Sequence, residues 1–226
     1  MGTIGDGMAW FKNTFRGQIN PAITGTPYTL SFLTAIATQE TFEIWGNLFQ
    51  AQPTAKILEV CVGDTIDAPS RKAFPIDKAA LLAIPNGIDL FLVARQALED
   101  MGAFNAAYHK IALANPDKFC HGFGIFQYDL QSAEGPDKGF FLDRLWLDFA
   151  ECLKRCLSEL DAARKRANLE AVPALTDLER AYVAIAYNSG SFNPAHGLKQ
   201  GFYDSSSGKY YGELIADYIE KANAIP

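Results

Sequence analysis

Apolar residues recur at steps of three and four positions through most of this 226-residue sequence. That spacing places them on one side of an α-helix, so it predicts a mainly α-helical protein. The expected helices span residues 29–49, 77–84, 87–101, 103–114, 140–168, 176–189 and 210–223. Two segments, 56–62 and 123–129, are rich in strand-forming residues and predict a small β element.

The charge balance of the chain narrows the classes of function. Its formal net charge is -6 at pH 7, so it lacks the basic surface that a nucleic-acid binder needs. No segment approaches the roughly 20 apolar residues of a membrane-spanning helix. No secretory signal peptide, with a basic region followed by an apolar run, is visible at the N-terminus. We therefore expect no nucleic-acid partner and no membrane span.

Four cysteines are spread along the chain, at positions 61, 120, 152 and 156. Cys152 and Cys156 share one face of an expected helix but are poorly oriented for a disulfide, so we interpret them as buried thiols. No histidine lies near them at metal-ligand spacing, and we expect no metal site.

A carboxylate lies on the apolar face of the helix expected at 29–49. Leu33, Ile36, Ala37 and Ile44 define that face, and Glu40 falls on it. Burial disfavours the charged form of a carboxyl group and raises its pKa, as a general acid near neutral pH requires. The alternative is a structural role, in which Glu40 pairs with a buried cation or lies at a solvated edge.

Two later segments contain polar residues that suit a sugar-binding site. In GFGIFQYD, Gln127 follows Gly122 and Gly124, and glycines let a backbone and a ligand approach closely. The alternative is a simple turn. His121, just before this segment, is expected to be structural.

The helix expected at 176–189 has clear end signals. Thr176 and Glu179 form a capping box, and Gly190 stops the helix. Its buried face is expected to consist of Leu178, Tyr182 and Ile185. Tyr187 and Asn188 then lie in the last turn, where they either face a binding site or serve as a core residue and a cap.

Taken in order, ATQETF, GFGIFQYD and IAYNSGSFNP resemble the three signature motifs of soluble lytic transglycosylases and goose-type lysozymes. These families belong to the lysozyme-like superfamily. The resemblance implies a mainly α, two-lobed fold with a small β element lining the cleft. It also implies one catalytic domain over residues 1–226, with an insert at about 50–120 between the catalytic Glu and the Gln motif.

The resemblance assigns roles to individual residues. Glu40 is the implied catalytic acid, and Thr41 stands where the family usually has serine, a change that keeps a hydroxyl group. The implied substrate-binding residues are Thr41, Gly124, Gln127, Tyr187 and Asn188.

A second carboxylate decides the type of reaction. In CVGDTIDAP, Asp64 and Asp67 follow the expected strand, where goose-type lysozymes carry aspartates that hold a water. An inverting glycosidase needs such a base, whereas a transglycosylase does not. We favour Asp64 because it follows Gly63 directly. Asp67 and Asp129 are further candidates, and the alternative for Asp64 and Asp67 is a turn or helix-cap role.

The implied activity is that of a muramidase, which hydrolyses the β-1,4 bond between N-acetylmuramic acid and N-acetylglucosamine in peptidoglycan. Such an enzyme needs no cofactor and acts at the bacterial cell wall, in the periplasm or outside the cell. Alternatives are a lytic transglycosylase that forms 1,6-anhydro products, a chitinase or chitosanase, and a non-enzymatic glycan-binding module. The tyrosines at 203, 210 and 211 suit either a sugar-stacking rim or the packing of the last helix.

Overall fold

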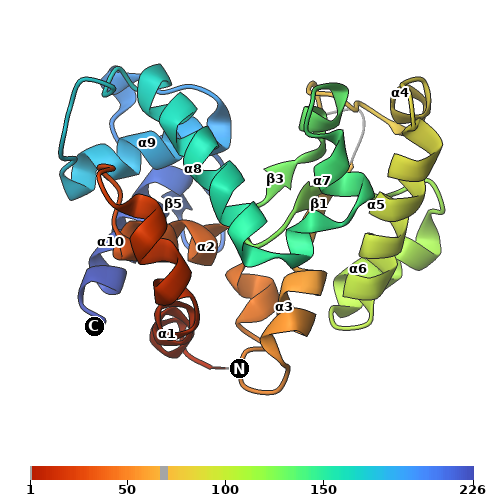
Figure 1. The fold of residues 1–226 in the computed structure, drawn as a ribbon, viewed down its shortest axis with the longest axis horizontal. Helices are drawn as coiled ribbons and strands as arrows, with labels where there is room; N and C mark the ends of the chain where they lie inside the picture. Colours follow the sequence, from red (N-terminus) through yellow and green to blue (C-terminus); the bar gives the residue numbers. More distant parts are fainter. Residues whose placement is uncertain (1, 67–70) are drawn as a thin grey trace. The chain divides into compact units, whose positions relative to one another are not determined.

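The computed structural model describes residues 2–66 and 71–226 of the chain, and these residues form a mainly α-helical protein with small antiparallel sheets (Figure 1). The chain divides into two compact units. Unit 1 comprises Met1–Phe42 and Leu153–Pro226, and unit 2 comprises Glu43–Cys152. The implied insert at 50–120 therefore lies within unit 2.

Unit 1 is built from helices that come from both ends of the chain. Its elements are α1 (Ile4–Ile23), most of α2 (Leu30–Trp45), most of α8 (Phe149–Arg166), α9 (Asp177–Ser189), η3 (Pro194–His196), β4 (Tyr203–Asp204), β5 (Lys209–Tyr210) and α10 (Tyr211–Asn223). The two strands form a short antiparallel hairpin in which Tyr203 pairs with Tyr210. Large apolar side chains of α1, α2 and α10 fill the core, including Phe11, Phe15, Phe32 and Ile215.

A buried lysine ties three helices of unit 1 together. Lys12 of α1 is only 3% exposed. Its ammonium group donates hydrogen bonds to Ser31 of α2, to the carbonyl of Ala222 in the last turn of α10 and to that of Ile225 just beyond it. Burial lowers the pKa of Lys12. These acceptors compensate for the removal of the ammonium group from water, and in turn the lysine satisfies carbonyls at a helix end.

Unit 2 combines helices with a three-stranded antiparallel sheet in the order β1-β2-β3. Its elements are α3 (Thr54–Val60), β1 (Val62–Thr65), α4 (Lys78–Leu82), α5 (Gly87–Gly102), α6 (Ala106–Ala114), β2 (Cys120–Phe123), β3 (Tyr128–Asp129), η1 (Leu130–Glu134), α7 (Lys138–Leu142) and η2 (Leu145–Leu147). In the sheet, Gly63 of β1 lies opposite Gly122 of β2. Aromatic rings support the sheet, with Phe123 packed edge-on against both Phe141 and Trp146.

The structure differs from the sequence expectations about secondary structure at three places. Residues 54–60 form α3 instead of the start of a strand, because a short apolar run fits a buried helix as well as a strand. The expected helix at 140–168 is interrupted: Arg144 adopts a left-handed conformation with φ 53°, and the Asp148 side chain accepts a hydrogen bond from the Ala150 backbone N–H as α8 begins. Helix α1 was not expected, since its glycines and Pro21 obscure its periodicity, although Thr3 and Asp6 form a capping box.

Other expectations are confirmed. Helices α5, α9 and α10 lie where the apolar periodicity predicts them, and α9 has both its capping box and its left-handed Gly190 at the C-terminus. Within α9, however, Leu178 is 49% exposed and does not belong to the buried face. Both Cys152 and Cys156 are buried free thiols, as expected.

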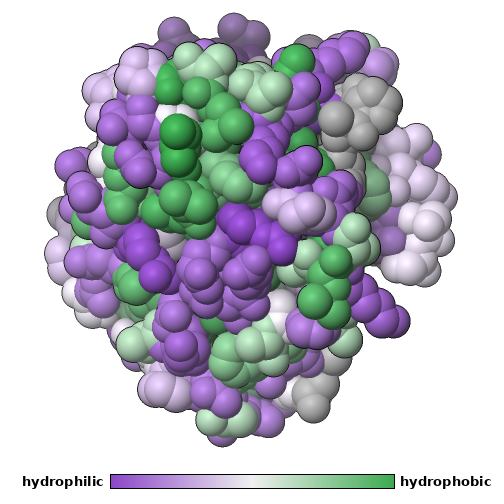
Figure 2. Space-filling model, turned by 90° about the vertical axis from the view of Figure 1, so that its right-hand side faces the viewer, coloured by the Kyte–Doolittle hydropathy of each residue, from purple (hydrophilic) through white to green (hydrophobic). Residues whose placement is uncertain are grey.

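Among the described helices, none is long and apolar enough to cross a membrane. A group of apolar side chains, shown in green in Figure 2, lies on the face over α4 and α5. Exposed apolar residues of these two helices are Leu82, Ile88 and Leu92.

Candidate active site

Glu40 lies on α2, next to a buried apolar face and in contact with α10. Ile36 and Ala37, one turn before it, are fully buried, whereas Glu40 itself keeps part of its surface exposed. The Tyr211 hydroxyl donates a hydrogen bond to Glu40 Oε1 over 2.8 Å. Glu40 is therefore a carboxyl group whose orientation is set by a buried tyrosine and whose surface is still accessible to a ligand.

Two tyrosines share the surroundings of Glu40. Burial, together with the nearby Glu40 carboxylate, raises the pKa of Tyr211 well above its usual value. Burial is also the main reason why the pKa of Tyr187 is raised, with added effects of Cys156 and Glu40. A tyrosine hydroxyl is already protonated at neutral pH, and these shifts move its ionisation still further above that range.

Asn188 follows Tyr187 in the last turn of α9 and is exposed. A methyl group at Gly201 would lie 3.6 Å from Asn188 Oδ1 and only 2.7 Å from Tyr211 Cβ. Gly201 has a φ of +82°, so both its backbone conformation and its surroundings favour glycine. The segment at 200–203 therefore runs close to Tyr211 and Asn188, and unit 1 gathers Glu40, Tyr187, Asn188 and Tyr211.

Thr41 is placed differently from the other residues of its motif. Its side chain is fully buried, and its hydroxyl donates a hydrogen bond to the carbonyl of Ala37 in the same helix over 3.1 Å. This geometry gives the hydroxyl a role within α2.

In unit 2, Gln127 lies in the turn between β2 and β3 rather than in an extended segment. Its φ is +54°, an unusual conformation for a residue with a side chain. The amide nitrogen donates to the carbonyl of Gly124 over 3.0 Å. Methyl groups at Gly122 and Gly63 would approach Gln127 Oε1 to 2.3 Å and 2.9 Å. The paired glycines thus make the space in which the Gln127 amide lies.

Asp64 lies within β1, close to the Gln127 turn, and is exposed. It also has a positive φ of 49°. Tyr108 of α6 adjoins it: the Asp64 backbone donates a hydrogen bond to the Tyr108 hydroxyl. Burial raises the pKa of Tyr108, and the charges of Cys120, Glu43 and Asp64 add to this effect. Asp64 and Gln127 are thus two non-glycine residues with positive φ in this sheet region, a locally strained backbone that is frequent at functional sites.

Asp129 is held by two partly buried basic residues. Arg71 binds one carboxylate oxygen over 2.6 Å, and His121 Nδ1 lies 3.3 Å from the other. Arg71 also donates to the carbonyls of Phe74 and Pro75. Burial acts to raise the pKa of Asp129, but hydrogen bonds from His121 and Arg71 outweigh it and lower the pKa. A carboxylate with a lowered pKa is a weaker base, so this pairing favours a structural role for Asp129.

Gly124 is buried against the C-terminal part of unit 2. Its φ is +77°, and a methyl group there would lie 2.5 Å from Cys152 Sγ. Close packing therefore accounts for this glycine.

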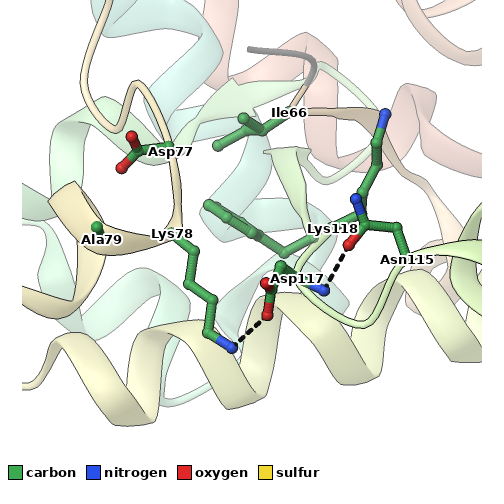
Figure 3. A pocket seen from close by; sticks show the side chains of 8 residues that line it. Ile66, Asp77, Lys78, Ala79, Asn115, Asp117 and Lys118 are labelled. Carbon is green, nitrogen blue, oxygen red and sulfur yellow. Dashed lines mark hydrogen bonds and ion pairs between the residues drawn. The ribbon is translucent and has the colours of Figure 1, made fainter.

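Unit 2 has a cavity of about 250 Å³ (Figure 3). It is lined by Ile66, Asp77, Lys78, Ala79, Asn115, Asp117, Lys118 and Phe119. Lys78 points toward Asp117, with 2.7 Å between the ammonium nitrogen and the carboxylate oxygen. Lys78 and Asp117 therefore form an ion pair at the wall of this cavity.

Asp67 lies outside the described residues. Within residues 2–66 and 71–226, no three His, Cys, Asp or Glu side chains are grouped so that they would hold a metal ion. Sequence reasoning did not single out Tyr108 or Arg71, and it left Tyr211 undecided between a sugar rim and packing. No local pattern marks these residues, because each acts through a partner distant in the sequence.

No protein-family model, no curated protein and no solved structure matches this chain. The assignment of a function therefore depends on the residues and contacts described above.

Proposed function

We propose that this chain hydrolyses the β-1,4 glycosidic bonds of peptidoglycan, with Glu40 as the general acid. The observation that supports it most directly is the 2.8 Å hydrogen bond from the buried Tyr211 hydroxyl to the partly exposed Glu40. A general acid must be held within reach of the leaving oxygen, and a carboxyl group oriented by a fixed donor meets that need.

The neighbours of Glu40 suit a sugar substrate. In the proposal, Tyr187 helps to hold Glu40 in place: burial is the main reason why its pKa is raised, with added effects of Cys156 and Glu40. The exposed amide of Asn188 can both donate to and accept from an acetamido group. In the proposal, the Gln127 amide contributes a further sugar contact.

The water-activating base is proposed to be Asp64. This carboxylate is exposed, in contrast to Asp129, which is paired with Arg71 and His121. The lysozyme-like, two-lobed fold and an action at the bacterial cell wall belong to the same proposal. The mainly helical fold and the small sheet beside Gln127 support it.

Replacing Glu40 tests the proposal directly. Clearing of purified peptidoglycan sacculi should fall about 100-fold or more in Glu40→Gln, since the variant keeps the shape of the side chain but has no proton to give. Glu220→Gln is the matched control, because Glu220 is exposed on α10 of the same unit. Unchanged clearing by Glu40→Gln, or no clearing by the wild-type protein, would show that the proposal is wrong.

The products distinguish hydrolysis from transglycosylation. Hydrolysis gives muropeptides with reducing ends, whereas a transglycosylase gives 1,6-anhydro products that are lighter by one water molecule. Mass spectrometry of the wild-type digest should show reducing ends. If Asp64 holds the attacking water, the Asp64→Asn variant should release no products with reducing ends. Anhydro products in the wild-type digest would instead favour the transglycosylase.

A further inference from the structure

Asp64 has an unusual backbone conformation within the sheet of unit 2. Gly63, the residue before it in β1, pairs with Gly122 of β2, and Thr65, the residue after it, pairs with Cys120. Between these paired residues, Asp64 has a φ of 49°, in the left-handed region, whereas strand residues normally have a negative φ. A residue other than glycine is strained in that region, so surrounding contacts have to hold it there.

A side chain of α6 provides such a contact. The backbone N–H of Asp64 donates a hydrogen bond to the hydroxyl oxygen of Tyr108. A methyl group at Gly63 would lie 3.4 Å from the same oxygen, so the Tyr108 hydroxyl lies against β1 where Gly63 is followed by Asp64. The tyrosine therefore binds the backbone at the residue that departs from the extended conformation.

The position of Tyr108 is fixed by the start of α6 and by its packing on α5. The Asn105 side chain caps α6 and accepts hydrogen bonds from the N–H groups of Ala107 and Tyr108. A methyl group at Gly102 of α5 would lie 3.1 Å from the Cα of His109 and 3.6 Å from the carbonyl carbon of Tyr108. The two helices are therefore in close contact at Tyr108, and its half-buried side chain extends from a fixed backbone.

The Gln127 amide lies against the same part of the sheet. A methyl group at Gly63 would lie 2.9 Å from Gln127 Oε1, in addition to its contact with the Tyr108 hydroxyl. These two side chains and the glycine thus surround the backbone on one side, whereas Asp64 itself is exposed. The carboxylate is open to solvent while the backbone that carries it is held.

We propose that Tyr108 is a positioning residue for Asp64: its hydroxyl fixes the Asp64 backbone and so sets the direction of the carboxylate that holds the attacking water. This inference rests on the proposed function and adds a residue that acts on the reaction through Asp64. An inverting base has to hold a water against the anomeric carbon, and a displacement of about 1 Å lowers a rate by about 100-fold. A return of Asp64 to a negative φ would turn its Cα–Cβ bond, and with it the carboxylate.

Amide hydrogen exchange tests the contact without any turnover. Tyr108→Phe removes only the hydroxyl, so the Asp64 N–H loses its acceptor and should exchange with solvent about tenfold faster. Residue-resolved NMR measures this rate. Tyr128→Phe is the matched control, because it removes a tyrosine hydroxyl of the same unit that donates to Asp137 instead. It should leave exchange at Asp64 unchanged.

Azide tests the role of Tyr108 in the reaction. In the proposed hydrolysis, Glu40 gives its proton to the leaving oxygen as the bond from that oxygen to the anomeric carbon breaks, and Asp64 takes a proton from the attacking water. Azide is already an anion, so it can attack the anomeric carbon without a base and give a glycosyl azide.

With soluble peptidoglycan fragments, Tyr108→Phe should lower kcat about tenfold and leave KM within about twofold of the wild-type value. Azide should restore part of the lost rate with formation of glycosyl azide, whereas it should add little to the wild-type rate. A residue that only supports the fold gains nothing from azide, because its loss does not affect the base alone.

Wild-type exchange at Asp64 in Tyr108→Phe, or a lowered rate that azide does not raise, would overturn the inference. Equal changes in Tyr128→Phe would overturn it as well, because they would indicate a general loosening of unit 2. Failure of the proposed function gives a different result: the wild-type protein then cleaves no fragments. The role of Tyr108 in the reaction is then wrong too, while amide exchange still shows whether its hydroxyl holds Asp64.

Discussion

The hydroxyl of Tyr211 helps to orient the carboxyl group of Glu40. It donates over 2.8 Å from α10, 171 positions further along the chain. Since Tyr211 is only 3% exposed, the surrounding core holds this donor in place. Such a donor favours the ionised form of the carboxyl group, so it affects both the orientation of Glu40 and the pH at which it loses its proton.

Tyr211→Phe should lower the rate of peptidoglycan clearing about tenfold, the effect of losing one hydrogen bond to a carboxyl group. Without this donor, ionisation of the carboxyl group is less favourable, so the high-pH limb of the rate profile should move to higher pH. Rates measured across pH check both effects. Tyr218→Phe, on the same helix, is the control; a wild-type rate and pH profile for Tyr211→Phe would contradict this role.

Gly122 makes room for the Gln127 amide, which leads to a second prediction. Gly122→Ala would place a methyl group 2.3 Å from Gln127 Oε1, so the amide must move. If that amide contacts the sugar, kcat/KM should fall about tenfold or more. Steady-state kinetics on soluble peptidoglycan fragments measures this change.

Gly17→Ala is the corresponding control, because its added methyl group would meet no atom within 4 Å other than the adjacent backbone of its own helix. On helix α1 this substitution should leave kcat/KM unchanged and stabilise the protein by about 0.5–1 kcal/mol. A wild-type kcat/KM for Gly122→Ala would show that the position of the Gln127 amide does not matter for the reaction.

At the scale of elements, periodicity and end signals predicted α9 well, because its cap residues and its apolar positions are all local. They did not predict the interruption between α7 and α8. Trp146, in the interruption, is fully buried against Phe123, a tertiary contact that the apolar pattern of one helix does not reveal. The candidate residues followed the same rule: Glu40 was singled out from the pattern of its own helix, whereas Tyr108 and Arg71 depend on partners elsewhere in the chain.

The contact of Arg71 with Asp129 joins the segment at 71–75 to β3 and should stabilise unit 2. Asp129→Asn removes the charge from a partly buried ion pair and should lower the free energy of unfolding by about 2 kcal/mol at pH 7. Because the folded protein lowers the pKa of Asp129 from 3.8, this contribution is complete above that value. It is lost as the pH falls through the lower, folded-state pKa.

Urea unfolding at pH 7 and at successively lower pH should therefore show that the gap between wild type and Asp129→Asn narrows below about pH 4. Asp117→Asn is the control, since Asp117 pairs with Lys78 on the surface and its side chain is 64% exposed. Its effect should stay below about 1 kcal/mol. A gap that does not depend on pH would mean that the charge of Asp129 contributes nothing.

At the scale of the whole molecule, unit 1 is discontinuous: its two chain segments are separated by the whole of unit 2. Lys12 links these segments, because it lies in the first and binds the carbonyls of Ala222 and Ile225 in the second. Its position also supports α10, the helix that begins at Tyr211. We therefore expect the position of Tyr211, and with it the hydrogen bond to Glu40, to depend on the contacts at the other end of α10.

Lys12→Met keeps much of the side-chain volume but removes the ammonium group that binds the carbonyls of Ala222 and Ile225, so it should destabilise unit 1 by about 3 kcal/mol. The buried thiols report which unit opens: Cys156 lies in unit 1 and Cys120 in unit 2. Thiol labelling followed by peptide mass spectrometry should show faster modification of Cys156 and little change at Cys120. Lys199→Met, at an exposed position, should change neither rate. Equal acceleration at both cysteines would show instead that the two units unfold together.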